Sequence, residues 1–286
     1  MQVLNFFDPW KSELCTCPRK YSFSPYSGCS HACVYCYASS YIKNFFKCRP
    51  KKDVVKKLVS DLKKIDKNFP VSISNSSDPY VPEEEKLKLT RDCLKYFALH
   101  RCKVLIITKS NIVARDTDIL SKMKACVSVT ITTLNEEIAR KLEPKASLPR
   151  KRIKALEILS KKGIPTVVRL DPVIPFLNEN EIEDIVEVST SVGAKHLVSS
   201  TYKVRPDNWR RFSFLFPEIS KKLKDLYFKY GEKISNSFYL PKETRFRIMK
   251  KVREACDKNK ISFSCCREGF FELNNSKSCD GTHLIK

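Results

Sequence analysis

The chain has 286 residues, of which 42% are hydrophobic, and this is enough to bury a full core in one large domain or in two. The composition excludes an intrinsically disordered chain. Lysine and arginine number 54 against 32 aspartates and glutamates, so the formal net charge is +22. An anionic partner such as a nucleic acid is one expectation, and lysine-rich helix faces that only keep the protein soluble are the alternative.

No stretch of the sequence is apolar enough to span a bilayer, and residues 1–14 show no basic start followed by an apolar run. We therefore expect a cytoplasmic protein without membrane partners. A reducing compartment keeps the 13 cysteines as thiols, and their clustered spacing then favours metal sites over disulfides. Cys93, Cys102 and Cys126 lie in apolar helix or strand patterns and are expected to be small core residues.

Strand and helix patterns alternate along the first 200 residues. Strands are expected at 21–24, 71–74, 103–108, 126–131, 164–170 and 195–200. Helices are expected at 53–65, within 83–99, at 116–123, from about 135, from about 150 until Gly163, and at 180–191, with N-caps at Asp53 and Asp116. Six such units predict an α/β fold, namely a partial (β/α)6 TIM-like barrel with a parallel sheet covered by helices.

The domain boundaries follow from this alternation. We expect an N-terminal extension at 1–20, a barrel core at 21–202, and a helical, cysteine-bearing C-terminal extension at 203–286 packed on the core. The C-terminal extension reads as two basic helices, at 216–230 and 242–258, followed by a strand and a tail. Ligands of parallel sheets collect at the carboxyl ends of the strands, so the loops there are expected to carry the chemistry.

Three cysteines form a compact loop after the first strand. Cys29, Cys33 and Cys36 have the spacing C-x3-C-x2-C. Iron-sulfur clusters usually take four cysteines, so a 4Fe-4S cluster on this triplet leaves one iron open to a ligand such as S-adenosylmethionine. Tyr35 fits an aromatic side chain beside the cluster and the adenine, or ordinary packing. The alternative to a cluster is a zinc site with His31 or a distant cysteine as fourth ligand.

The wider sequence resembles a known family over about residues 20–270. The loop SPYSGCSHACVYCYA resembles the cluster loop of radical SAM proteins, in the branch that includes the spore photoproduct lyases. The supporting segments are SNSSDPYVPEEEKLKLTR at 74–91, TKSNIVARD at 108–116, TITTLNEEIARKLEP at 130–144 and RLDPVIPFLNE at 169–179. The resemblance implies a barrel of radical SAM type, a 4Fe-4S cluster, S-adenosylmethionine, and a reductant such as ferredoxin or flavodoxin.

The resemblance also implies roles for residues at the strand ends. Lys109 would pair with the carboxylate of S-adenosylmethionine, unless it is a surface lysine. A serine-aspartate segment would bind the amino group of S-adenosylmethionine, and the alternative is a capped turn. Two threonines would reach its ribose, and the alternative is that they are ordinary strand residues. A further arginine and one carboxylate would face the mouth, or form an internal ion pair, and a second carboxylate is a further candidate for the mouth. These residues are Ser76, Ser77 and Asp78, then Thr130 and Thr132, and last Arg169, Asp171 and Glu143.

One position departs from the lyase pattern. The lyases carry a cysteine just before the serine-aspartate segment as hydrogen donor in the repair of a thymine dimer. By alignment, Asn75 stands at this place. An asparagine side chain cannot donate a hydrogen atom, so we do not assign photoproduct repair to this chain.

A second group of cysteines lies near the two ends of the sequence. Chain ends often meet in compact domains, and four thiolates there could hold an auxiliary iron-sulfur cluster or a zinc ion. Cys265 and Cys266 are adjacent and alternate in direction on a strand, so only one of them can face such a site. The expected ligands are Cys15, Cys17, Cys266 and Cys279.

Three functions fit these features. The first is an enzyme that makes a 5'-deoxyadenosyl radical, the second is a nucleic-acid-binding protein with a structural cluster, and the third is a zinc-stabilised interaction module. We expect RNA or DNA with an exposed base to bind over the barrel mouth along the 203–247 region. Its basic and aromatic residues are Lys203, Arg205, Trp209, Arg210, Arg211 and Phe212. The alternative is a solvated helix face with Trp209 packed inward.

Overall fold

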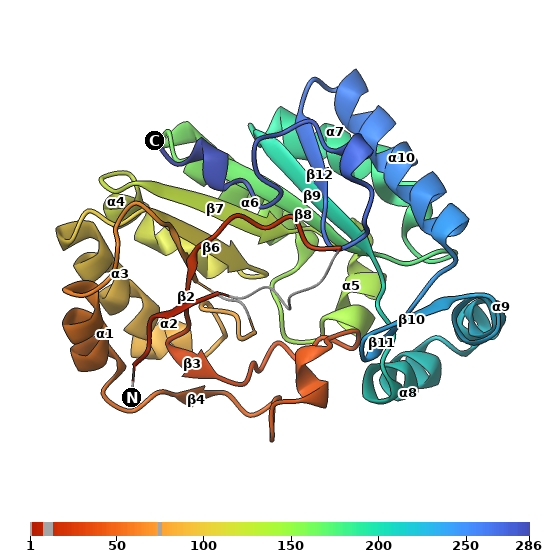
Figure 1. Ribbon diagram of the computed structural model, residues 1–286, viewed down its shortest axis with the longest axis horizontal. Helices are drawn as coiled ribbons and strands as arrows, with labels where there is room; N and C mark the ends of the chain where they lie inside the picture. The colour runs from red at the N-terminus through yellow and green to blue at the C-terminus, as the bar shows by residue number, and fades with distance from the viewer. Residues whose placement is uncertain (1, 8–13, 74–75) are drawn as a thin grey trace.

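The computed structural model describes residues 2–7, 14–73 and 76–286. An eight-stranded sheet forms the centre of an α/β fold (Figure 1), with the strand order β1-β2-β5-β6-β7-β8-β9-β12. The strands from β2 to β12 are parallel, and β1 pairs antiparallel with β2. Their bounds are β1 (Asn5–Phe6), β2 (Tyr21–Phe23), β5 (Val71–Ile73), β6 (Val104–Thr108), β7 (Ala125–Thr130), β8 (Thr166–Val173), β9 (His196–Thr201) and β12 (Ser262–Cys265).

The six predicted strands are all present as neighbours in this sheet, so the predicted α/β class is confirmed. The sheet is open, because β1 and β12 do not pair with each other in the described part of the chain. This arrangement is compatible with a partial barrel. β12 lies beyond residue 202 and yet pairs with β9, so the C-terminal segment extends the sheet of the core.

Helices and short ribbons surround the sheet. The α-helices are α1 (Val54–Leu62), α2 (Glu84–Leu87), α3 (Leu89–Leu99), α4 (Thr117–Leu120), α5 (Glu136–Leu142), α6 (Pro149–Lys161), α7 (Ile182–Ser191), α8 (Pro206–Leu215), α9 (Pro217–Phe228) and α10 (Lys242–Lys258). The sequence did not predict α8. The remaining elements are the ribbons β3 (Tyr26–Ser27) with β4 (Arg49–Pro50) and β10 (Glu232–Ile234) with β11 (Ser237–Tyr239), and the 3-10 turns η1 (Ala38–Ser40), η2 (Asn111–Asp116), η3 (Glu179–Glu181), η4 (Phe271–Leu273) and η5 (Thr282–Leu284).

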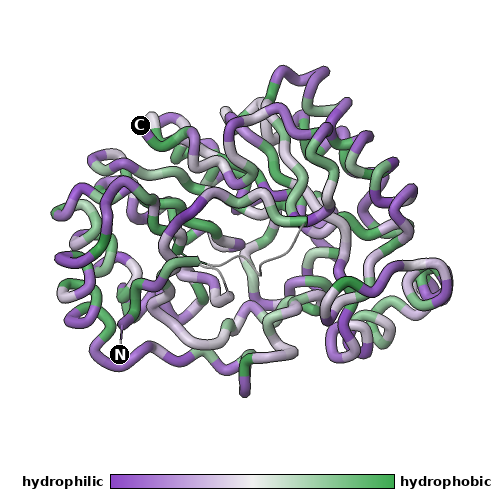
Figure 2. The backbone as a smooth tube through the Cα atoms, in the orientation of Figure 1, coloured by the Kyte–Doolittle hydropathy of each residue, from purple (hydrophilic) through white to green (hydrophobic). Residues whose placement is uncertain are grey.

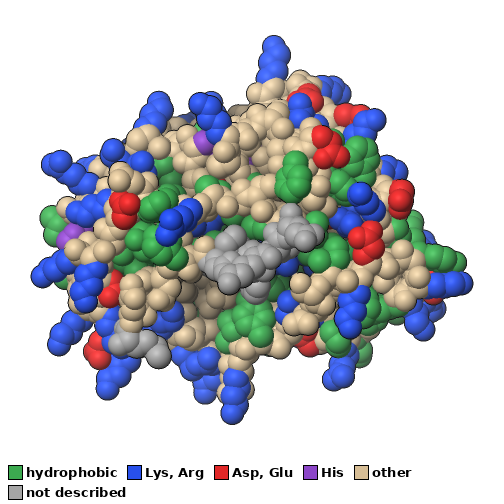
Figure 3. Space-filling model, viewed as in Figure 1, with side chains coloured by type: hydrophobic (Ala, Val, Ile, Leu, Met, Phe, Trp, Pro, Cys, Tyr) green, Lys and Arg blue, Asp and Glu red, His purple; other side chains and the backbone are tan. Residues whose placement is uncertain are grey.

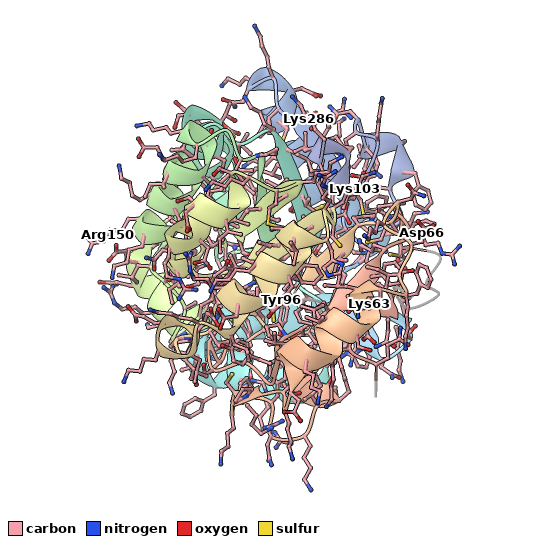
Figure 4. All side chains as sticks on the ribbon, turned by 90° about the vertical axis from the view of Figure 1, so that its left-hand side faces the viewer. Lys63, Asp66, Tyr96, Lys103, Arg150 and Lys286 are labelled. Carbon is pink, nitrogen blue, oxygen red and sulfur yellow. The ribbon has the colours of Figure 1, made fainter. Side chains whose placement is uncertain are left out.

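The core lies between the sheet and the apolar faces of these helices. Figure 2 shows hydrophobic residues along the central strands and hydrophilic residues on the outer turns of the helices. Leu58 and Leu62 of α1 are buried, and burial of one leucine contributes about 1.5–3 kcal/mol. Helices α1 and α3 lie side by side on one flank of the sheet, where Lys63 and Tyr96 mark them in Figure 4.

Helix termini show where local sequence signals held and where they failed. Asn135 caps α5, because its side chain accepts hydrogen bonds from the backbone N–H groups of Glu137 and Ile138. Gly163 follows α6 with φ +72°, as expected for a helix end. Asp53 and Asp116 occupy the predicted N-cap positions of α1 and α4, but neither side chain caps its helix. Asp116 instead forms buried ion pairs with arginines.

No helix in the described ranges combines the length and the apolar character that crossing a membrane requires. Lysine and arginine side chains project around the whole outline of the face in Figure 3. On this face the positive charge is therefore spread over many elements and does not form one compact patch.

Candidate active site

The three clustered cysteines lie between β3 and η1 and line one pocket. Cys29 and Cys33 are buried and Cys36 is half-buried. The opposite wall comes from the carboxyl ends of the parallel strands, through Lys109 after β6 and Thr130 at the end of β7. The cysteine loop and the strand ends thus meet at one place, as the sequence predicted.

Hydrogen bonds to its backbone groups hold the cysteine loop at three places. The N–H of Cys29 donates to the carbonyl of Phe45 at 2.7 Å, and the N–H of Val34 donates to the carbonyl of Leu142 at 2.8 Å. Helix α8 supplies the third anchor. Arg211 donates from Nε to the carbonyl of Val34 and from Nη2 to the carbonyl of Cys36, each at 3.2 Å.

Asn208 adds to this anchor, because its Nδ2 donates to the carbonyl of Tyr35 at 3.1 Å. Neither Asn208 nor Arg211 was predicted as a loop anchor, since the sequence places them about 170 residues from the loop. No local signal could have found them. Their role depends on the tertiary position of α8.

Gly28 starts the cysteine loop in a conformation that only glycine adopts easily. Its φ is +76°, and a Cβ there would lie 2.5 Å from the carbonyl oxygen of Phe45 and 2.6 Å from that of Lys47. Both obstacles are backbone atoms and cannot rotate away. The close approach of the two segments is therefore possible only with glycine at position 28.

The positions of the three thiols distinguish between the two kinds of metal site that the sequence suggests. In the part of the chain that the structure describes, no three His, Cys, Asp or Glu side chains are close enough to bind a single metal ion. A tetrahedral zinc ion needs its thiolates about 4 Å apart, whereas a cubane spreads them further because each thiolate binds a different iron. Three thiols that share a pocket without converging on one point fit the cluster and not the zinc ion.

Asp78 is an organiser of the pocket wall. Its carboxylate accepts hydrogen bonds from the hydroxyl of Thr108 and the backbone N–H of Lys109, each at 2.7 Å, and lies 3.4 Å from Nδ1 of His31. Burial alone would raise the pKa of Asp78, but His31 more than offsets this and lowers it. Asp78 therefore ties the end of β6 to the cysteine loop, and its oxygens are already in use.

The two serines before Asp78 differ in position. Ser76 lines the pocket, whereas Ser77 is buried and is absent from the pocket lining. Ser76 is therefore the better placed of the two for a ligand. Asn75, where the lyases carry their cysteine, lies outside the described residues.

Lys109 reaches into the pocket beside Tyr35. Its Nζ lies 3.3 Å from Oγ1 of Thr130 and 5.7 Å from the centre of the Tyr35 ring. Lys109 has no carboxylate partner among the described ion pairs. Its charge is thus available to an anionic group in the pocket.

A buried ion pair stands behind Tyr35. Glu143 pairs with Arg152, and both side chains are 1% exposed. Glu143 also accepts hydrogen bonds from the hydroxyls of Tyr35 and Thr132. Thr132 does not line the pocket, so the geometry does not support its predicted contact with ribose, and Glu143 holds Tyr35 in place and does not face the mouth.

Arg169 and Asp171 both line the pocket and also pair with each other at 2.9 Å. The sequence left open a place at the mouth or an internal ion pair, and these two residues have both. Asp171 accepts a further hydrogen bond from Ser200 at 2.7 Å. Next to this pair, Lys203 lies 3.0 Å from buried Glu268, so Lys203 belongs to the pocket and not to an outer strip.

Several residues of the strip that was expected to bind nucleic acid make contacts within the protein instead. Trp209 packs against Phe212, Tyr227 and Phe228, with ring centres 5.2–6.1 Å apart. Trp209 therefore packs inward, and Arg211 anchors the cysteine loop. Arg210 is exposed, and Arg205 lies over the rings of Tyr37 and Tyr41 near the pocket.

The sequence profile of the Radical SAM superfamily matches residues 23–188, more than half of the chain. This range contains the cysteine loop and the strand ends that form the pocket. The chain belongs to the radical SAM superfamily. The predicted fold of radical SAM type and the predicted family are thereby confirmed.

Relatives of this radical SAM protein occur in archaea, bacteria and a virus. An uncharacterised protein of Methanocaldococcus jannaschii is 31% identical over 209 residues, which cover 72% of this chain and 74% of the relative. An uncharacterised protein of Acidianus two-tailed virus is 27% identical and covers 74% of this chain and 78% of its own. An uncharacterised protein of Mycobacterium tuberculosis is 22% identical, covering 86% and 76%.

Solved structures share the fold at low sequence identity. A spore photoproduct lyase variant has a TM-score of 0.72 at 12% identity and covers 93% of this chain and 79% of the lyase. A lyase with bound AdoMet and dinucleoside spore photoproduct has a TM-score of 0.68 at 14% identity, covering 86% and 75%. The radical S-adenosylmethionine methyltransferase TsrM of Kitasatospora setae has a TM-score of 0.61 at 12% identity, covering 92% and 57%.

Proposed function

We propose that this radical SAM protein cleaves S-adenosylmethionine reductively in the described pocket. Cys29, Cys33 and Cys36 would hold a 4Fe-4S cluster with one iron free of protein ligands. When bound and reduced, such a cluster would supply one electron for cleavage of the C5'–S bond of S-adenosylmethionine, which gives methionine and a 5'-deoxyadenosyl radical able to abstract hydrogen from a substrate.

The side chains of the pocket bind and orient the cofactor in this proposal. Lys109 presents its ammonium group to the methionine carboxylate, and Ser76 offers a hydroxyl to the amino group. Thr130 contributes a hydroxyl for the ribose. Tyr35 supplies an aromatic wall that cannot rotate freely, because Glu143 accepts its hydroxyl hydrogen bond.

One observation carries the proposal. The three thiols and the available cation of Lys109 face the same pocket at the carboxyl end of a parallel sheet. A structural cluster in a nucleic-acid-binding protein needs no cation and no pocket beside it. Formation of 5'-deoxyadenosine by the anaerobically reconstituted, reduced protein tests the proposal, and nucleic-acid binding without this product would favour the structural cluster.

We further propose that the substrate is anionic and that, among anionic molecules, it is a nucleic acid. Arg169, Lys203 and Arg267 also line the pocket, and the chain carries a net charge of +22. A spore photoproduct lyase that shares this fold binds a dinucleoside spore photoproduct. Binding that releases counterions from phosphates weakens steeply with salt.

The test compares RNA and DNA affinity over a range of salt concentrations. An Arg205→Gln and Arg267→Gln double variant is expected to bind more weakly and with a shallower salt slope than the wild type. Lys122→Gln and Lys124→Gln form the control, because both lysines precede β7 at the amino end of the sheet, away from the pocket. Equal loss in both double variants would point to diffuse attraction and would exclude the mouth as the binding surface.

A further inference from the structure

The cysteines outside the triplet differ in their surroundings. Cys93, Cys102 and Cys126 are buried in the core, as predicted. The Sγ atoms of Cys17 and Cys279 lie 3.5 Å apart, although 262 positions separate these residues in the sequence. Among the described residues, no three His, Cys, Asp or Glu side chains could hold a metal ion there. The second metal site expected from the sequence therefore stays a prediction.

Residues 37–52, which follow the cysteine triplet, pack directly against the cysteine loop. The carbonyl of Phe45 accepts a hydrogen bond from the N–H of Cys29 at 2.7 Å. Both residues belong to one buried hydrophobic cluster, and Ile42 and Cys36 pack against it. In Figure 1 the segment is orange and runs along the lower edge of the molecule toward β4. One side of the segment thus contacts the proposed cluster ligands.

The outer side of this segment carries two aromatic rings and two lysines. Tyr41 and Phe46 are 47% and 38% exposed, and Lys43 and Lys47 are exposed as well. These four residues are called the 41–47 surface below. Aromatic side chains are enriched at protein–protein interfaces relative to the rest of a protein surface. None of these four side chains lines the pocket, so a partner bound to them would leave the pocket open to a substrate.

Arg49 holds the backbone of this surface in place. Its Nη1 donates to the carbonyl of Asn44 at 3.0 Å and to that of Lys47 at 2.8 Å. Its Nη2 donates to the carbonyl of Lys43 at 3.3 Å. The backbone that carries both lysines is therefore ordered before a partner arrives, and binding costs less conformational entropy.

The charge of this part of the chain is one-sided. Residues 14–52 contain seven lysines and arginines but no aspartate or glutamate, and the next longest stretch without a carboxylate, 93–115, has 23 residues against 39. Cations project from the whole outline in Figure 3, so the lack of carboxylates distinguishes this segment. Asp207, which α8 brings next to Ser39, is paired with Arg211 at 3.2 Å. The surface therefore attracts an acidic partner and disfavours a basic one.

We propose that an acidic electron-carrier protein docks on the 41–47 surface and delivers single electrons to the cluster of the proposed function. The need for such a partner rests on the proposed function, because reductive cleavage consumes one electron for each S-adenosylmethionine. The docked carrier is oxidised by one electron and the cluster is reduced by one, with no transfer of atoms.

The surface offers a short route to the cluster. From Phe46, one peptide bond leads to the carbonyl of Phe45, which accepts the hydrogen bond from the N–H of Cys29. Electron transfer slows steeply with distance, so a carrier is most effective where little protein separates it from the acceptor. Weak redox partners form small interfaces, below about 1,200 Å², and one short segment can supply the centre of such an interface.

Two reductants test the surface and the proposed function separately. Dithionite is small and needs no docking surface, whereas reduced flavodoxin is an acidic carrier protein that does. In Lys43→Gln with Lys47→Gln, the iron content and the dithionite-driven yield of 5'-deoxyadenosine are expected to equal those of the wild type. The flavodoxin-driven rate at low salt is expected to fall about fivefold or more, and to depend less on salt.

Lys122→Gln with Lys124→Gln is the matched control, because it removes the same charge at the amino end of the sheet. This control is expected to match the wild type with both reductants. Affinity for oxidised flavodoxin, measured by equilibrium titration of the reconstituted protein, adds a readout that requires no product. It is expected to fall only in the Lys43 and Lys47 variant.

Equal flavodoxin affinities and rates in the two double variants would overturn the proposal. So would a wild type that forms product with dithionite but neither binds flavodoxin nor forms product with it. Loss of affinity for RNA or DNA, and not for flavodoxin, in the Lys43 and Lys47 variant would assign the surface to nucleic acid and also overturn the proposal. A wild type that binds flavodoxin through this surface but forms no product with dithionite would support the surface and contradict the proposed function.

Discussion

Arg211 of α8 donates a hydrogen bond from Nη2 to the carbonyl oxygen of Cys36 at 3.2 Å. The same guanidinium also bonds the carbonyl of Val34 and the hydroxyl of Ser39. A residue of the C-terminal segment therefore sets the position of a proposed cluster ligand. This contact explains why a basic residue at this place is not available to an external phosphate.

Replacement of Arg211 by methionine is expected to make the cluster labile. The variant keeps the length of the side chain but loses the bonds to the loop carbonyls, each of which contributes about 1 kcal/mol or more. Loss of iron to a chelator is expected to be several-fold faster than in the wild type. Arg210→Met is the control, because Arg210 is exposed and its side chain makes none of these bonds. Equal rates in the two variants would remove Arg211 as an anchor.

Gly28→Ala is expected to prevent cluster assembly while most of the sheet still folds. The added Cβ would meet two backbone carbonyls at 2.5 and 2.6 Å, and the φ of +76° disfavours any side chain. Gly163→Ala is the control, since Gly163 also has positive φ but has nothing within 4 Å of the added Cβ. Iron content of the two reconstituted variants distinguishes the steric clash from backbone strain alone.

Lys109→Ala is expected to weaken S-adenosylmethionine binding about tenfold to a hundredfold and to leave the iron content unchanged, because one charge-assisted hydrogen bond is lost. Lys122→Ala, which removes an exposed lysine, is expected to bind normally. Affinity is measured by equilibrium binding to the reconstituted protein. Unchanged affinity in Lys109→Ala would mean that this lysine has no role in cofactor binding. Ser77→Ala is expected to have little effect, because Ser77 does not line the pocket.

Arg152→Met is expected to lower the free energy of unfolding by about 3–5 kcal/mol, because it leaves Glu143 charged and buried without its partner. Arg150→Met is the control on the same helix, since Arg150 lies at the outer surface (Figure 4), is 74% exposed and pairs there with Glu136. Urea denaturation of the metal-free protein measures both. A loss below about 1 kcal/mol for Arg152→Met would contradict the role of the pair.

The same pair predicts a pH dependence. Burial alone would raise the pKa of Glu143, but Arg152 and Lys109 more than offset this and lower it to about 2 from its ordinary value of 4.5. The folded protein thus loses this proton more readily than the unfolded chain does. The resulting stability is fully present above pH 4.5 and is lost as pH falls toward 2, by about 3 kcal/mol in all. Glu143→Gln is expected to flatten this part of the profile.

The sheet could be predicted from the sequence because buried parallel strands and amphipathic helices each carry a strong local pattern. Strand residues such as Val127 and Val168 are fully buried, and this requires apolar runs that stand out in the sequence. The cysteine triplet could be recognised as easily, since its three cysteines lie within eight residues. The position of Lys109 at the pocket followed from its place directly after a strand.

The parts that could not be predicted depend on contacts between distant segments. Thr132 and Glu143 read as mouth residues, but Arg152 draws Glu143 behind Tyr35, and Thr132 turns to the same carboxylate. The sequence left open whether Trp209 is a stacking platform or packs inward, and α8 packs it against α9. The neighbours of a helix decide which of its faces turns inward. The sequence of α8 carries no signal that this helix holds the cysteine loop.

The most direct test of the central claim is the yield of 5'-deoxyadenosine from S-adenosylmethionine by the anaerobically reconstituted protein with a chemical reductant. The wild type is expected to form this product, and the Cys29→Ala, Cys33→Ala and Cys36→Ala triple variant is expected to form none. Equal yields from the two proteins, or no product from a wild type that binds both iron and S-adenosylmethionine, would contradict the claim.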